Sequence, residues 1–189
     1  MAGVAVRYGS ARQPVTALEG VDLRIRAGEF VVLVGPSDCG KTSLLRVVAG
    51  FERPSSGTAL VRGAVPRPGG GAGVVFQQPR LFPWRTVGGN LGFALARHGV
   101  PRAERAGRIA ELLERAGPPG TTVLFVTHSA EEAVLLGSRV LVMAAGPGRV
   151  VAELPVGLDR GPETDVAALR ASAEFARLRG RLTEAVRRP

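Results

Sequence analysis

Lysine, cysteine, aspartate and aromatic residues are all scarce in this chain of 189 residues. The single cysteine, Cys39, excludes an intrachain disulfide and favours a reducing compartment. Aromatic residues make up 5% of the chain, and no apolar run approaches the roughly 18 residues of a membrane span. The chain does not open on a basic and then apolar leader, so we expect no signal peptide and a location in the cytoplasm or at a membrane surface.

Basic residues outnumber acidic ones by 25 to 16, which gives a net charge of +9. The arginines are scattered, and no aromatic residues are interleaved with them to stack on bases. We therefore expect a solvated basic surface and no nucleic-acid partner. The alternative, a nucleic-acid-binding protein, has only the net charge in its favour. The hydrophobic share of 45% is enough for a buried core, so we predict one domain over residues 1–189 and exclude intrinsic disorder.

Hydrophobic patterning predicts strands that alternate with helices. Residues 30–34 (FVVLV) and 121–128 (TTVLFVTH) read as strands buried on both faces. Further strands are expected at 4–8, 21–25, 73–76, 139–143 and 149–154. Helices are expected after residue 42, at 101–116, after a capping box formed by Ser129 and Glu132, and from Thr164 onward. This order predicts the α/β class with a mainly parallel sheet.

Residues 35–42 (GPSDCGKT) fit the phosphate-binding pattern G-x-x-x-x-G-K-[ST] and lie between a buried strand and a helix. Glycines let the loop curl so that backbone N–H groups face a phosphate, and the helix N-terminus adds its positive end. Lys41 would reach the β- and γ-phosphates, and the Thr42 hydroxyl would ligate Mg²⁺. Lys41 is also the only lysine among the 25 basic residues. Asp38 places a carboxylate in the same loop, so we expect weakened phosphate affinity.

With these motifs, the chain resembles the ATP-binding subunits of ABC transporters, in particular importers of the nitrate, sulfonate and taurine type. The residues that carry the resemblance are Tyr8 in VRYG, GPSDCGKTS at 35–43, Gln77 in VVFQQPRLFPW and His128 in LFVTHSAEEA. The resemblance implies a P-loop NTPase fold of the ABC ATPase kind, with N-terminal antiparallel strands beside the mainly parallel sheet.

The resemblance also assigns roles to individual residues. Tyr8 corresponds to the aromatic residue that stacks on adenine, Gln77 to the Q-loop glutamine near Mg²⁺ and the attacking water, and His128 to the switch histidine at the γ-phosphate. The implied catalytic residues are His128 and Gln77, and the implied Mg²⁺ ligands are Thr42 and Gln77. The implied ATP-binding residues are Tyr8, Gly35, Pro36, Ser37, Asp38, Cys39, Gly40, Lys41, Thr42 and Ser43.

Three elements of the family are missing between Gln77 and His128, an interval roughly half as long as the family has there. These are the signature motif of the LSGGQ kind, the Walker B strand that ends in Asp-Glu, and the D-loop. No Walker B aspartate can exist in this interval, because the aspartates are Asp22, Asp38, Asp159 and Asp165. We therefore expect a domain shortened near 117–120, with a truncated helical subdomain and no Walker B strand. Without the Walker B aspartate and the following glutamate, Mg²⁺ loses an anchor and no side chain polarises the attacking water.

The resemblance thus implies an ATP-binding subunit of an importer that couples ATP to transport and whose hydrolysis is impaired. The alternative is a non-hydrolysing nucleotide-binding module or an inactive remnant. The implied cofactors are ATP and Mg²⁺. The implied partners are an integral membrane permease, a second copy of the chain and, indirectly, a solute-binding protein, with the chain peripheral at the cytoplasmic face of the membrane.

Overall fold

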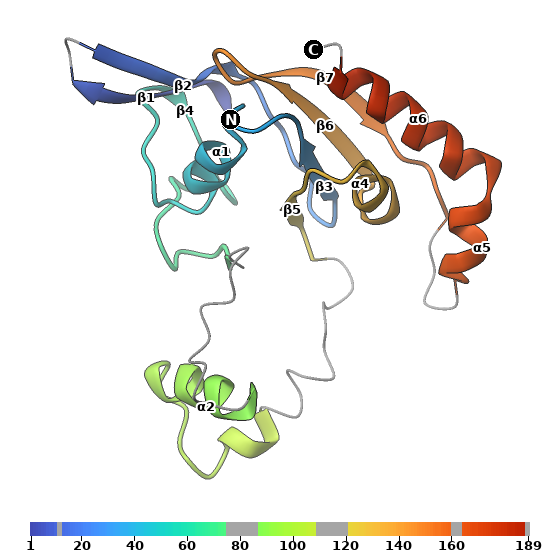
Figure 1. Cartoon of the computed structure of the whole chain (residues 1–189). Coiled ribbons are helices and arrows are strands. Elements are labelled where there is room, and N and C mark those ends of the chain that lie inside the picture. The colour runs from blue at the N-terminus through green and yellow to red at the C-terminus, as the bar shows by residue number, and fades with distance from the viewer. Residues whose placement is uncertain (11–12, 75–86, 109–120, 160–163, 188–189) are drawn as a thin grey trace. The chain divides into compact units, whose positions relative to one another are not determined.

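The computed structural model describes residues 1–10, 13–74, 87–108, 121–159 and 164–187 (Figure 1). The chain forms two compact units, residues 1–73 with 120–189 and residues 74–119. None of the described helices combines the length and the apolar character that a bilayer crossing needs.

The first sheet of the larger unit is antiparallel, with the order β2-β1-β4. It contains β1 (Ala2–Ser10), β2 (Gln13–Val21) and β4 (Ser56–Thr58). The strand predicted at 4–8 is confirmed within β1, whereas the strand predicted at 21–25 is wrong. Leu23 is buried like a strand residue, but its N–H bonds to the Met1 carbonyl outside any ladder. The true strand β2 contains Pro14, which is tolerated because β2 lies at the sheet edge.

The second sheet has the order β5-β3-β6-β7 and is the predicted mainly parallel core. β3 (Phe30–Val34) pairs in parallel with β5 (Val123–Val126) and with β6 (Arg139–Ala144), while β7 (Arg149–Pro155) runs antiparallel to β6. Val31, Val32 and Leu33 in β3 are fully buried, which explains the uninterrupted apolar run. In the described part of the chain, β3 is the only strand that pairs with β5.

Alternate residues of β3 belong to different hydrophobic clusters. Val31 and Leu33 pack with the first sheet and with α1 (Lys41–Val48). Val32 and Val34 pack in a second cluster with α4 (Ala130–Leu136) and α6 (Ala173–Arg187) (Figure 1). The loop after β3 therefore starts from a strand that is fixed on both faces, as a binding loop requires.

The helices differ from the sequence predictions at three places. The helix expected from Thr164 is two helices, α5 (Val166–Ala171) and α6, because Ser172 ends the first and its hydroxyl accepts the N–H of Phe175 in the second. In the smaller unit, α2 (Val87–Arg97) was not predicted, since its three glycines mask the periodicity. Of the helix expected at 101–116, residues 105–108 are helical and 102–104 form a turn. Residues 109–116 of that helix lie outside the described part of the chain. Of the strand expected at 73–76, residues 75–76 also lie outside it, and residues 73–74 do not form a strand.

Arg139 ties the starts of β3 and β6 together, away from the phosphate loop. Its guanidinium donates to Glu29 Oε2 at 2.8 Å, to Glu153 Oε1 at 2.9 Å and to the Arg24 carbonyl at 2.6 Å. A hydrogen bond from the Arg26 N–H and the charge of Arg139 hold the pKa of Glu29 below its ordinary value. The charged carboxylate of Glu29 therefore stabilises the fold at pH values above its ordinary pKa. This contribution to stability is lost as the pH falls through the lowered pKa.

Candidate functional site

The loop of residues 35–40 joins the end of β3 to the start of α1. Gly40 is the N-cap of α1, and its φ of +84° is a left-handed conformation that favours glycine. A Cβ on Gly40 would lie 2.5 Å from Leu18 Cδ2 and 2.6 Å from the Ala17 carbonyl oxygen. The second glycine of the motif is therefore required by both the backbone conformation and the contact with β2.

Lys41 lies inside this loop, with only 6% of its surface exposed. Its ammonium donates to the carbonyls of Gly35 at 2.9 Å and Pro36 at 2.5 Å, and lies 3.4 Å from Cys39 Sγ. Among the described residues, no carboxylate forms an ion pair with it. A buried cation without a counter-ion is costly, so the loop is suited to an anion that replaces these carbonyls as partner.

Asp38 has a φ of +61° and an exposed side chain. Asp is one of the few residues that adopt this left-handed conformation readily, which explains how it can stand where the resemblance expects glycine. The backbone of the loop is therefore preserved, and the substitution changes its charge.

We expect Asp38→Asn to tighten binding of MgATP about fivefold, because asparagine keeps the left-handed conformation and removes a charge that repels phosphate. Isothermal titration calorimetry at low and high salt would measure the effect. The gain should shrink at high salt, since screening already weakens the repulsion there. Equal affinities of the two proteins at low salt would contradict the expectation.

Tyr8 comes to the same region from β1. Its hydroxyl donates to Ser43 Oγ at 3.2 Å, and the half-buried ring packs against the cluster that includes Leu44. Tyr8 thereby connects the first sheet to the first turn of α1. Its contact with adenine stays a prediction.

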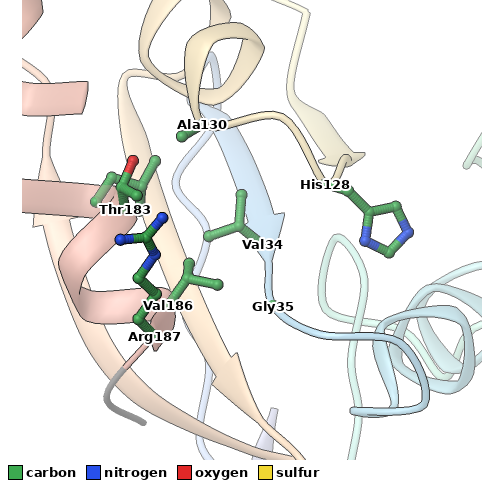
Figure 2. A pocket seen from close by; sticks show the side chains of 8 residues that line it. Val34, Gly35, His128, Ala130, Thr183, Val186 and Arg187 are labelled. Atoms are coloured by element: carbon green, nitrogen blue, oxygen red, sulfur yellow. The ribbon is translucent and has the colours of Figure 1, made fainter. Parts of the chain in front are cut away.

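His128 follows β5, and its side chain is exposed. Together with Gly35 it lines a cavity of about 150 Å³, whose other wall includes Thr183 and Arg187 of α6 (Figure 2). In Figure 2 the imidazole points away from α6, toward the side on which the chain leaves Gly35 for α1. The structure therefore brings Tyr8, residues 35–43 and His128 to one end of the larger unit, whereas Gln77 lies outside the described residues.

Sequence reasoning missed one residue that shapes the loop. Gly148, in the turn between β6 and β7, approaches it so closely that a Cβ there would lie 2.4 Å from the Cys39 carbonyl oxygen. Backbone bonds from Gly148 N–H to the Ala17 carbonyl and from Glu19 N–H to the Gly148 carbonyl fix that approach. The run Gly146-Pro147-Gly148 has the composition of a turn, but nothing in the local sequence indicates its contact with Cys39.

The predicted Mg²⁺ ligand Thr42 is exposed at the start of α1. In the described part of the chain, no group of three or more His, Cys, Asp or Glu residues could hold a metal ion. Mg²⁺ takes six oxygen ligands, so a single hydroxyl does not make a site for it. Thr42 would therefore hold the ion only together with further oxygen ligands, such as those of a bound nucleotide, and the second predicted ligand, Gln77, lies outside the described residues.

Comparisons with known proteins show the family and the fold. The family model described as ABC transporter matches residues 18–136. A taurine import ATP-binding protein of Mesorhizobium japonicum is 36% identical over 97% of this chain and 95% of its own length. One of the same name from Chromobacterium violaceum is 35% identical over 95% and 92%. A dimeric ATP-binding cassette in a post-hydrolysis state with ADP and Pi matches with a TM-score of 0.65 and 21% identity, over 85% of this chain and 98% of that one.

The alignment with the Mesorhizobium protein also contains positions without a residue of this chain. Its 245 aligned positions exceed the 189 residues of this chain by 56, so at least that many positions carry no residue of this chain. The structural likeness, at its low identity, shows the fold of an ATP-binding cassette, which is a P-loop NTPase fold as predicted. Because the family model and both relatives also match most of the sequence, the chain belongs to the ABC transporter family.

Proposed function

We propose that this chain binds ATP at residues 35–43 as the ATP-binding subunit of an importer and hydrolyses it at no more than a background rate. The observation that carries the proposal is the buried ammonium of Lys41, held by loop carbonyls at the N-terminus of a helix and without a carboxylate partner among the described residues. A triphosphate supplies the negative charge that this arrangement favours. The gamma end of the nucleotide would lie toward Gly35 and His128.

Impaired hydrolysis is inferred from what the site lacks. No aspartate occurs between residues 39 and 158, so the interval between Gln77 and His128 holds no Walker B aspartate. The alignment positions that carry no residue of this chain, at least 56 in total, support a shortened domain. Glu131 and Glu132 follow His128, yet Glu131 lies 3.2 Å from the Arg170 guanidinium and Glu132 bonds to Thr127, so both have other partners. Phosphoryl transfer would then lack both a second Mg²⁺ anchor and a group to orient the water.

Calorimetry with MgATP and a phosphate-release assay on the full chain test the two parts separately. We expect saturable binding of one nucleotide per chain, together with phosphate release no faster than that of the Lys41→Ala variant. No binding and no thermal shift would leave an inactive remnant. Robust release that depends on Lys41 would contradict impaired hydrolysis and would indicate a substitute acid.

The partners follow from the same proposal. The names of the relatives support an importer, so we propose docking on an integral membrane permease at the cytoplasmic face, an indirect link to a solute-binding protein, and a homodimer. Co-expression and co-purification with the permease of a taurine importer tests docking. A chain that binds MgATP but never co-purifies with that permease would be a free nucleotide-binding module.

A further inference from the structure

A closed set of hydrogen bonds surrounds His128 without including its side chain. Thr127, immediately before it, is 8% exposed, and its N–H donates to the Leu33 carbonyl at 3.2 Å. The Thr127 hydroxyl donates to Glu132 Oε2 at 2.5 Å and accepts from the Ser129 N–H at 3.0 Å. The residues on both sides of His128 are thus fixed to each other through one hydroxyl.

These bonds differ from the capping box that the sequence predicts. Ser129 Oγ does accept the Glu132 N–H at 3.2 Å, as an N-cap should. In a capping box the Glu132 side chain would accept the Ser129 N–H in return. Here it accepts from Thr127, and Thr127 accepts from Ser129 instead. Glu132 therefore links the start of α4 to the end of β5, which Ser129 alone would not achieve.

The direction of these bonds matters for His128. The Thr127 hydroxyl has one hydrogen, which it donates in the hydrogen bond to the Glu132 carboxylate. Its oxygen can therefore only accept in the hydrogen bond with the Ser129 N–H. A hydrogen bond to a charged carboxylate is stronger than one between neutral groups, and it polarises the next bond in the chain. The backbone at His128 is therefore held in one conformation beside Gly35 while its imidazole stays exposed.

We propose that Thr127 and Glu132 are positioning residues that aim the imidazole of His128 at a phosphate bound in the loop of residues 35–42. The inference rests on the proposed function, since the phosphate in question belongs to the bound nucleotide. Neither residue touches the nucleotide; each acts through the backbone conformation of His128. Loss of either side chain lets the imidazole sample several directions and weakens the contribution of His128 to binding.

The aim of the imidazole can be measured without nucleotide, because His98 and His128 are the only histidines. NMR spectra of the two imidazoles should show shifted and broadened His128 signals in Thr127→Val and Glu132→Ala, with His98 unchanged. Thr127→Ser should restore the original signals. Glu131→Ala removes the same charge from the same turn of α4 and should leave His128 unaffected. His128 signals identical to those of the original chain in Thr127→Val and Glu132→Ala would overturn the proposal, whether or not ATP binds.

A double-mutant cycle with MgATP tests the consequence. Thr127→Val and Glu132→Ala should each weaken MgATP binding about fivefold in the otherwise unchanged chain. In a His128→Ala background the same changes should weaken it less than twofold, because their effect passes through His128. Equal losses in both backgrounds would overturn the positioning role in favour of a general structural effect. If the unchanged chain binds no MgATP, the proposed function fails while the NMR result still decides the arrangement.

Discussion

Lys41→Ala is expected to raise the dissociation constant of MgATP at least about 100-fold. The ammonium is buried inside the loop, and its three hydrogen-bond partners are Gly35, Pro36 and Cys39 of the same loop. On binding, these protons would be donated to phosphate oxygens, and a hydrogen bond between charged groups contributes about 1.5–3 kcal/mol. Two such bonds account for about 3 kcal/mol, which corresponds to a factor of about 100 in affinity. Isothermal titration calorimetry would measure it.

Two matched variants separate charge from shape at this position. Lys41→Arg keeps the charge but replaces a compact ammonium by a larger, planar guanidinium. Lys41 is only 6% exposed, so the loop has no room for this group, and we expect the variant to lose most of its affinity for MgATP. Arg46→Ala removes an exposed cation from the same helix and should change affinity less than about threefold. If Lys41→Ala and Arg46→Ala had the same effect, binding would reflect the general basic charge of the protein and not the loop.

The central strand of the fold could be predicted because β3 is buried on both faces, whereas the residues of β5 are only half-buried, so the burial predicted for that strand on both faces is wrong. FVVLV and VLFV are uninterrupted apolar runs, and such runs are typical of a parallel sheet covered by helices. The strand at 21–25 was wrong for a related reason: alternating burial occurs there without a hydrogen-bonded ladder, and burial pattern alone does not distinguish the two. β2 was missed because Pro14 argues against a strand unless its place at the edge is known.

The candidate site shows the same division between local and tertiary information. The loop at 35–42 is a local sequence motif, and it contains the only lysine of the chain, Lys41. The link between Thr127 and Glu132 could not be predicted, because Glu132 also fits the pattern of a capping box with Ser129. The approach of Gly148 to Cys39 joins residues more than a hundred positions apart, which no local pattern encodes.

Gly40→Ala is expected to lower the free energy of unfolding by about 3 kcal/mol. An alanine at a φ of +84° costs about 1–2 kcal/mol in backbone strain. Its Cβ would also lie 2.5 Å from Leu18 Cδ2, and overpacking of this kind typically costs about 1–3 kcal/mol. Urea unfolding followed by circular dichroism would measure the difference.

Gly63→Ala provides the control that separates the two causes. Gly63 has a similar φ of +79°, but a Cβ there would meet nothing within 4 Å. Its replacement should therefore cost only the strain, about 1–2 kcal/mol, and leave MgATP binding unchanged. The excess loss in Gly40→Ala then measures the contact between the loop and β2. Equal losses in the two variants would show that Leu18 and Ala17 yield without cost, and that β2 does not hold the loop in the shape that places Lys41.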